Sequence, residues 1–183
     1  MDGLDDNLLV SKVAAGDRDA LRLLYERHAV KVWRVARRYL GNDADAEDVT
    51  QAVFLSLIDG ASLFRQEARF STWLYRVTAN RCLNHRALAG VRLRTGLDDD
   101  LAQAATAPAD QDPDRRVEAR EREAMLADAM ARLPDRQKMA VVLARFEGMS
   151  YEDVAAAMDC SVGTVESVLF RARQRLRKML VRG

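Results

Sequence analysis

The sequence holds few of the residues that build metal centres, disulfide frameworks or nucleophilic active sites. It has two histidines and two cysteines, and Cys82 and Cys160 lie far apart with no CxxC partner. We therefore expect no structural metal and no disulfide framework. The chain also has no glycine-rich phosphate loop and no Ser/His/Asp arrangement that would supply a nucleophile and its base. These absences predict a protein that is not an enzyme, with no catalytic residues, no cofactor and no metal.

Long hydrophobic runs are also absent. No stretch of about 18 apolar residues occurs that would span a membrane. The N-terminal segment MDGLDDNLLV is acidic, whereas a secretory signal would be basic. We expect a cytoplasmic protein with no membrane insertion.

Proline is scarce, with three residues, and no segment alternates polar and apolar residues with the period of a β-strand. Helix-favouring Ala, Leu, Arg and Glu are abundant, and apolar residues recur at helical spacing. The sequence therefore predicts an all-α fold. Helices are expected over 4–15, 18–40, from 43 or 44 to about 62, from about 72 to 89, over 117–130 and over 134–147. They are followed by a short helix after Ser150 and a second helix after Ser161 that ends in a run of arginines.

The helical period breaks down between residues 91 and 116. This segment contains three consecutive aspartates and two of the three prolines, a composition typical of a flexible linker. We therefore predict two small helical domains, 1–90 and 117–183, joined by a flexible acidic linker at 91–116.

The C-terminal domain ends in a predicted helix-turn-helix. Ser150 is a suitable N-cap for a short helix, and Ser161 is a suitable N-cap for a second one. Apolar residues recur on one face of the second helix, so its other face is left to solvent. Six Lys or Arg and no acid lie between Arg171 and Gly183. Such a helix can lie in a DNA major groove with basic residues on phosphates. The alternative is a plain helical hairpin with a solvated basic face.

The third predicted helix is acidic and apolar around much of its circumference. It carries five acids and no basic residue, and Phe54, Leu55 and Ile58 form a second apolar stripe beside the first. An exposed apolar strip rimmed by acids is typical of a docking face for a basic partner. Alternatively, both stripes belong to the core.

The fourth predicted helix has a polar face. Arg76, Asn80 and Asn84 recur at i, i+4 and i+8, and their amide and guanidinium groups suit contacts with bases and phosphates. Trp73 lies nearby and either stacks on a base or closes the core. His28 lies on the apolar stripe of the second helix, where we expect a core or rim histidine.

Three segments together resemble a bacterial RNA polymerase sigma factor of the two-domain extracytoplasmic-function (ECF) group in the sigma-70 family. They are DAEDVTQAVFLSL from Asp45, RFSTWLYRVTANRCLN from Arg69, and LPDRQKMAVVLARFEGMSYEDVAAAMDCSVGTVESVLFRARQRL from Leu133. The resemblance covers nearly the whole chain apart from the linker. It implies a subunit that directs core polymerase to specific promoters and assists DNA melting.

The resemblance also implies roles for the acidic third helix, for the polar face of the fourth helix and for the exposed face of the last helix. Core polymerase would be bound through its clamp helices by Asp48, Gln51, Phe54 and Leu55. The minus-ten element would be bound by Arg65, Phe70, Trp73, Arg76, Asn80 and Asn84. The minus-thirty-five element would be bound by Thr164, Glu166, Ser167, Phe170, Arg171 and Arg173. The implied partners are core RNA polymerase, promoter DNA and an anti-sigma factor.

Two positions depart from the family's pattern. Glu166 stands where Lys or Arg is frequent, and Val168 stands where Arg is frequent, so the reading helix has less positive charge. Glu166 either accepts a hydrogen bond from a cytosine or interacts with the helix dipole.

Two other functions remain open. A sigma mimic would sequester an anti-sigma factor without binding DNA; Glu166 and Val168 favour it, whereas Asn80, Asn84 and the basic C-terminus oppose it. A stand-alone helix-turn-helix repressor would leave the acidic helix and the linker unexplained.

Overall fold

The computed structural model describes residues 5–63, 69–94 and 113–181, and every regular element in those ranges is helical. The N-terminal half contains α1 (Asp6–Ala14), α2 (Arg18–Leu40), α3 (Asp43–Gly60), the short turn η1 (Ala61–Leu63) and α4 (Phe70–Arg94). The C-terminal half contains α5 (Pro113–Ala131), α6 (Asp135–Val141), the π-helical turn η2 (Val142–Phe146), α7 (Tyr151–Ala157) and α8 (Val162–Leu180). The prediction of an all-α fold is confirmed.

The helix ends expected from the sequence are capped by their own side chains. Asp17, Ser150 and Ser161 accept hydrogen bonds from backbone amides in the first turns of α2, α7 and α8. Such a bond satisfies a helix N–H group that has no partner within the helix. Gly41 ends α2 with a φ of 98°, a left-handed conformation that residues with a Cβ rarely adopt.

Two helices extend into the segment expected to be a linker. α4 continues to Arg94, and α5 begins at Pro113, a residue type favoured in a first helical turn because its missing N–H would be unsatisfied there. α4 also begins two residues earlier than expected, at Phe70, whose amide donates to Asn7 Oδ1 at 2.9 Å. The central part of the expected linker, 95–112, lies outside the described residues.

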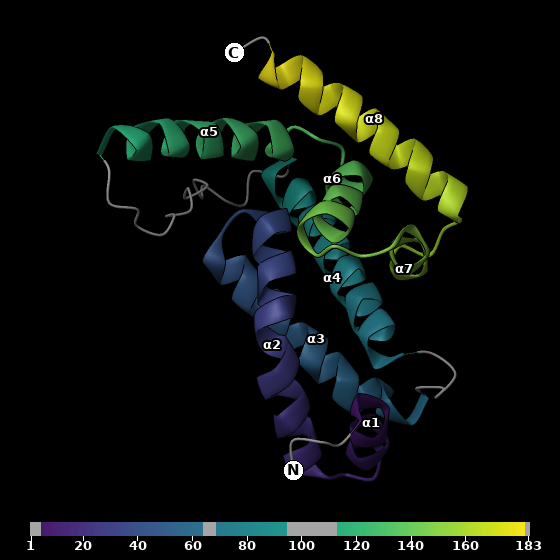
Figure 1. Cartoon of the computed structure of the whole chain (residues 1–183). Helices are drawn as coiled ribbons and strands as arrows, with labels where there is room; N and C mark the ends of the chain where they lie inside the picture. The colour runs from purple at the N-terminus through teal and green to yellow at the C-terminus, as the bar shows by residue number, and fades with distance from the viewer. Residues whose placement is uncertain (1–4, 64–68, 95–112, 182–183) are drawn as a thin grey trace.

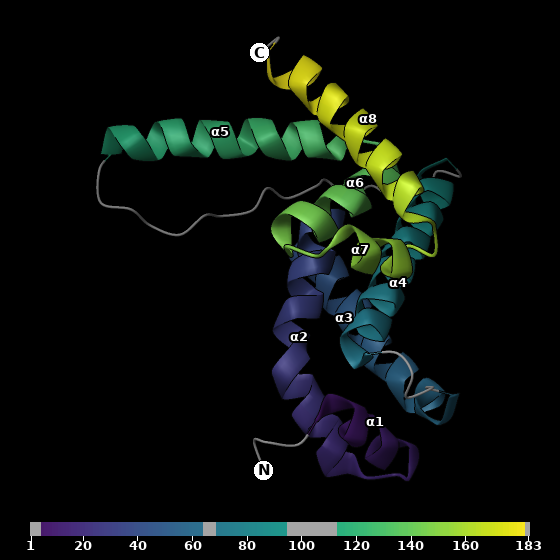
Figure 2. The same cartoon turned by 45° about the vertical axis from the view of Figure 1, so that its right-hand side comes forward.

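The core of the N-terminal domain lies between α2, α3 and α4, which run beside one another in Figures 1 and 2. Its side chains come from all three helices and include Leu24, Val35, Val53, Leu57 and Leu74. His28 is buried at the α1 end of this core. Its Nε2 lies 2.7 Å from Asp6 Oδ2, and its ring meets Phe70 edge-on. The expectation of a core histidine is therefore confirmed.

The C-terminal domain packs against one end of the N-terminal domain. α6 and α7 lie against α4, and η2 lies against α2, whereas α5 and α8 reach beyond the N-terminal helices (Figure 1). The buried apolar residues of both domains form one continuous cluster. The sequence predicts the two helical units but contains no pattern that indicates this contact.

Candidate functional site

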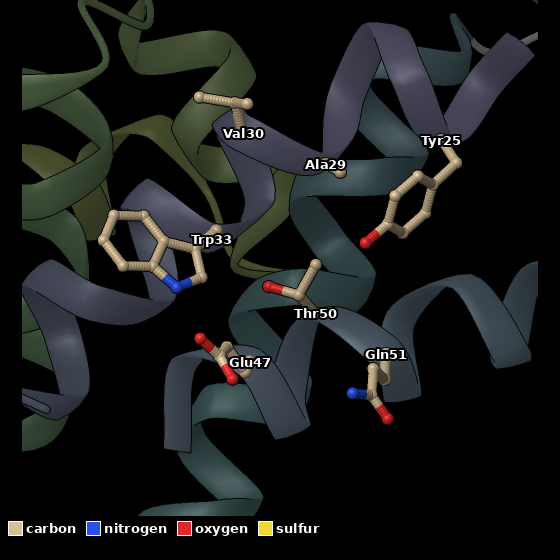
Figure 3. Close-up of a pocket in the computed structure, with 7 residues that line it drawn as sticks. All are labelled: Tyr25, Ala29, Val30, Trp33, Glu47, Thr50 and Gln51. Atoms are coloured by element: carbon tan, nitrogen blue, oxygen red, sulfur yellow. The ribbon is translucent and has the colours of Figure 1, made fainter. Parts of the chain in front are cut away.

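A groove of about 400 Å³ lies between α2 and α3 (Figure 3). In the close-up, the indole nitrogen of Trp33 points toward Glu47, and the hydroxyl of Tyr25 points toward α3. A second hollow of about 420 Å³ shares Tyr25 and Gln51 and continues to Leu55 and Ile58. Together they form a surface that we call the α2–α3 groove. It is lined by Arg18, Leu21, Arg22, Tyr25, Ala29, Val30, Trp33, Glu47, Thr50, Gln51, Phe54, Leu55 and Ile58.

The second apolar stripe of α3 is divided between the core and this groove. Leu55 is 61% exposed and Ile58 is half exposed, whereas Phe54 is 6% exposed. Phe54 is covered because the ring of Tyr25 on α2 lies against it. Neither alternative from the sequence is therefore right for the whole stripe, and the expectation that Phe54 belongs to an uncovered surface is wrong. Asp48 and Gln51, also predicted for docking, are exposed.

Sequence reasoning missed the contribution of α2 to the groove. Val30 is 69% exposed and Tyr25 is about half exposed, although Tyr25 keeps the helical period of the buried residues. Val30 lies off that period, on the polar side of α2. An isolated apolar residue in that position was the feature of the sequence that could have indicated an exposed apolar surface on α2. The groove thus combines apolar and aromatic side chains with the acids of α3.

The polar residues of α4 lie where the sequence places them. Arg76, Asn80 and Asn84 are exposed, whereas Leu74 and Thr78 of the same helix are buried. We call the exposed set the α4 polar face. Arg76 Nη2 lies 3.8 Å from Asp159 Oδ2 of the C-terminal domain, so one end of this face is next to that domain.

The aromatic residues at the start of α4 support one another. Phe70 is 1% exposed and stacks on Trp73, with ring centroids 5.9 Å apart. Trp73 is half-buried. Phe70 therefore belongs to the core and fixes the position of Trp73, and its own ring does not face solvent. Arg65, which was predicted for the same function, lies outside the described residues.

One face of α8 is polar and basic. The predicted apolar stripe is confirmed, since Val165, Leu169 and Ala172 are buried and Leu176 is half-buried. Every residue of α8 predicted to contact DNA is exposed. These residues are Thr164, Glu166, Ser167, Phe170, Arg171 and Arg173, and Arg175, Arg177 and Lys178 extend the basic surface.

Glu166 is the fifth residue of α8, after the cap at Ser161. The first turn of α8 contains no acid. The helix dipole acts mainly on charges within the first turn, so its effect on Glu166 is small. No ion pair involves Glu166 in the ranges that the structure covers. Its carboxylate is therefore exposed to solvent.

The described residues contain no cluster of three or more His, Cys, Asp or Glu side chains that would hold a metal ion. Burial raises the pKa of the Cys82 thiol to about 12, so this cysteine stays protonated and unreactive at neutral pH. No helix in the described ranges is both long and apolar enough to cross a membrane.

In comparisons with known proteins, each half of the chain matches a family model. The family model for sigma-70 region 2 matches residues 24–90, and the model for sigma-70 region 4 matches residues 123–176. The chain is 38% identical over 178 residues to the ECF RNA polymerase sigma-E factor of Haemophilus influenzae, covering 93% of each protein. It is 35% identical over 180 residues to the RNA polymerase sigma-H factor of Pseudomonas aeruginosa, covering 96% of this chain and 93% of that protein.

Two solved structures have the same fold. CnrH, in complex with the cytosolic domain of CnrY, matches with a TM-score of 0.68 at 25% identity over 96% of each chain. The sigma factor RpoE of Bartonella quintana, in complex with the anti-sigma factor NepR, matches with a TM-score of 0.68 at 22% identity over 87% of this chain and 95% of that one. The chain therefore belongs to the sigma-70 family of RNA polymerase sigma factors, in its extracytoplasmic-function group.

Proposed function

We propose that this protein is a non-catalytic sigma factor that binds core RNA polymerase, directs it to specific promoters and assists melting of the DNA there. The observation that carries the proposal is the presence, on one chain, of an apolar groove and two separate polar faces within the segments that match regions 2 and 4. A sigma factor needs three such surfaces, for polymerase, for the minus-ten element and for the minus-thirty-five element.

The α2–α3 groove is the proposed site for core polymerase. Exposed Leu55 and Ile58 offer apolar contact, and Asp48 gives the neighbouring surface a negative charge. An apolar centre with a charged rim is typical of a specific protein interface, and the acids favour a basic partner. Gln51 and Tyr25 belong to the same surface. Phe54 contributes indirectly, because it holds the ring of Tyr25 in place.

The α4 polar face is the proposed reader of the minus-ten element. Asn80 and Asn84 have both donors and acceptors for the edges of unpaired bases, and Arg76 carries a charge for phosphate. Trp73 lies at the start of the same helix, where an aromatic ring can stack on an extruded base. Arg65 precedes it in the sequence and is proposed for the same element.

The exposed face of α8 is the proposed reader of the minus-thirty-five element. Ser167, Phe170 and Arg171 are proposed to contact base edges, and Arg173 is proposed to bind phosphate. Glu166 is proposed to accept a hydrogen bond from a cytosine amino group. Thr164 lies nearest the N-terminus of α8, and its hydroxyl is 2.9 Å from that of Ser161.

An anti-sigma factor is a further proposed partner. The structurally similar RpoE was solved in complex with an anti-sigma factor, which supports this proposal for a chain of the same fold. The polymerase and DNA partners imply a cytoplasmic site of action. The sigma mimic remains the second candidate because Glu166 and Val168 lower the positive charge of α8.

Run-off transcription with purified core polymerase on a promoter library tests the proposal. We expect transcripts that depend on this protein and that come from promoters sharing two sequence elements. A mimic would give no transcripts under any condition, and it would still bind its anti-sigma factor. That result would refute the proposed function.

A further inference from the structure

The first turn of α1 carries two consecutive polar residues that bind helices far away in the sequence. Asp6 pairs with two residues of α2: Arg27 Nη1 lies 2.8 Å from Asp6 Oδ1, and His28 Nε2 lies 2.7 Å from Asp6 Oδ2. Asn7 Oδ1 accepts a hydrogen bond from the backbone amide of Phe70, the first residue of α4, at 2.9 Å. The later turns of α1 bury Leu9, Val10 and Val13 in the core. α1 therefore connects the start of α4 to α2, and it lies close to that end of α4 in Figure 1.

The amide of Phe70 takes its acceptor from a distant residue. In α2, α3, α7 and α8 the cap is the residue directly before the helix. The residue directly before α4 is Arg69, and a guanidinium group donates hydrogen bonds but accepts none. The N–H groups of a first helical turn have no partner within the helix, so they need an acceptor from outside it. Asn7 supplies one from 63 residues earlier in the chain.

The first turn of α4 also contains Trp73, the aromatic residue proposed to stack on an extruded base. Its ring stacks on the buried ring of Phe70, which in turn meets His28 edge-on, with those two ring centroids 5.3 Å apart. Trp73 Cζ2 also lies 3.7 Å from the place that a Cβ would take at Gly60, at the end of α3. The amide of Trp73 donates to the carbonyl of Arg69 at 3.3 Å and closes the turn. The place of the ring therefore depends on the first turn of α4 keeping its shape.

The other proposed minus-ten residues of α4 lie further from this turn. At 3.6 residues per turn, Asn80 and Asn84 are about three and four turns from Phe70. Helices open most easily at their ends, so the loss of an acceptor at Phe70 would loosen the first turn and leave the later ones intact. Of the proposed minus-ten residues that the structure describes, Trp73 is therefore the one whose ring Asn7 controls most directly.

We propose that Asn7 is a positioning residue for the minus-ten contact: its side-chain oxygen fixes the first turn of α4 and, through that turn, the ring of Trp73 that stacks on the unpaired base. The inference rests on the proposed function for its DNA ligand, whereas the effect of Asn7 on the first turn does not depend on DNA. The competing account is a role in stability alone, because the loss of a cap destabilises a helix wherever it lies.

Amide hydrogen exchange in the free full-length protein, measured by NMR, tests the cap directly. Asn7→Ala removes the acceptor, and we expect the Phe70 amide to exchange faster, on the order of tenfold. Asn7→Asp keeps an acceptor oxygen and places a negative charge at the start of α4, so it should restore slow exchange. Asp17→Ala is the matched control, because it removes a cap in the same domain from α2 instead of α4. Circular dichroism verifies that every variant folds and that the two cap losses lower the melting temperature by similar amounts.

Holoenzyme made with each variant is then titrated with a short labelled fork DNA whose minus-ten strand is unpaired. Asn7→Ala should misplace one stacking contact and weaken binding on the order of tenfold. Asp17→Ala and Asn7→Asp should bind like the wild type. A double-mutant cycle identifies the residue through which Asn7 acts. Asn7→Ala should add nothing to the loss caused by Trp73→Ala, and it should add fully to the loss caused by Asn80→Ala.

Unchanged exchange of the Phe70 amide in Asn7→Ala would show that Asn7 does not hold the first turn. Equal losses of DNA affinity in Asn7→Ala and Asp17→Ala, or a loss that adds to that of Trp73→Ala, would show that Asn7 serves stability alone. Each of these results overturns the proposal, and so does faster exchange with unchanged DNA affinity. If the wild-type holoenzyme binds no fork DNA and gives no transcript, the proposed function fails and the inferred effect on the base fails with it, while exchange of the Phe70 amide still reports the cap.

Discussion

The ring of Tyr25 in α2 lies 4.8 Å from the ring of Phe54 in α3, centre to centre, at an interplanar angle of 60°. This contact changes how the docking residues of α3 should be tested. Because Phe54 is buried, truncating it to alanine should lower the free energy of unfolding by about 3–5 kcal/mol, as is typical of a core phenylalanine. A loss of polymerase binding in that variant would then report unfolding as well as docking.

The exposed residues of the groove allow a cleaner test of polymerase binding. We expect Asp48→Arg combined with Leu55→Ala to weaken binding to core polymerase at least tenfold, because the change reverses a rim charge and removes an apolar contact. Leu88→Ala is the control, since Leu88 is an exposed leucine of α4 outside the groove. Binding is measured by titration of labelled protein with core polymerase. Equal affinities for the double variant and the control would refute the docking assignment.

The α4 polar face should matter more for promoter opening than for the first binding step. Asn80→Ala and Asn84→Ala each remove an amide proposed to contact an unpaired base, a contact worth about 1–3 kcal/mol. Permanganate footprinting detects unpaired thymines and is compared at equal promoter occupancy. We expect lower thymine reactivity in both variants. Full reactivity at the same occupancy would show that these amides do not contact the melted strand.

Glu166 offers a test of base reading on α8. If its carboxylate accepts a hydrogen bond from a cytosine, Glu166→Arg should change the preferred minus-thirty-five base. It should also strengthen DNA binding overall and steepen the dependence of log affinity on log salt by up to roughly one unit, for one added phosphate contact.

Selection from randomised minus-thirty-five sequences compares the wild type with Glu166→Arg and Glu166→Gln. If Glu166 instead served only the helix dipole, the glutamine variant would lose a little stability and keep the same base preference. The same consensus sequence from all three proteins would contradict base reading.

Lys138 should make the stability of the protein depend on pH. Its burial lowers its pKa from 10.5 to about 8, and the positive charge of Arg86 acts in the same direction. Between these two pH values the unfolded state binds more protons than the folded state, so the free energy of unfolding should rise with pH. The cost of burying the charge is fully present below about pH 8 and is lost above about pH 10.5.

Lys138→Met isolates this effect because methionine fills a similar volume without a charge. We expect the variant to be more stable than the wild type at pH 7, where the lysine is charged. The difference should shrink as the pH rises from 8 to 10. Urea denaturation of both proteins at several pH values measures it, and a difference that stays constant with pH would mean that Lys138 is not buried as a charged group.

The sequence predicts the helices and the exposed polar faces well, because both depend on local signals. Asp17 and Gly41 mark the ends of α2 through cap chemistry that involves only neighbouring residues. The alternation of buried Leu74 and Thr78 with exposed Asn80 follows from helical spacing. These features need no information on how the helices pack.

Features that depend on distant residues are not predictable in this way. Phe54 is covered by Tyr25 from another helix, and nothing in the period of α3 separates it from exposed Leu55. In the sequence, Glu147 is an acidic residue before a glycine, and nothing near it indicates that it is buried. Its ion-pair partners Arg34 and Arg38 belong to α2 and are 113 and 109 residues away, so its burial follows only from the way the two domains meet.

The π-helical turn η2 sets the direction of Glu147, whose amide donates to the carbonyl of Val142, five residues earlier. An α-helix would instead bond to the residue four earlier, and each residue turns a helix by about 100°. With the same number of residues in α-helical geometry, Glu147 would be turned further round the helix axis and away from α2. The contact between the two domains therefore depends on the wider spacing of a single turn. A change that converted Val142–Phe146 to a regular α-helix would alter the pairing of the domains even if every charged residue were retained.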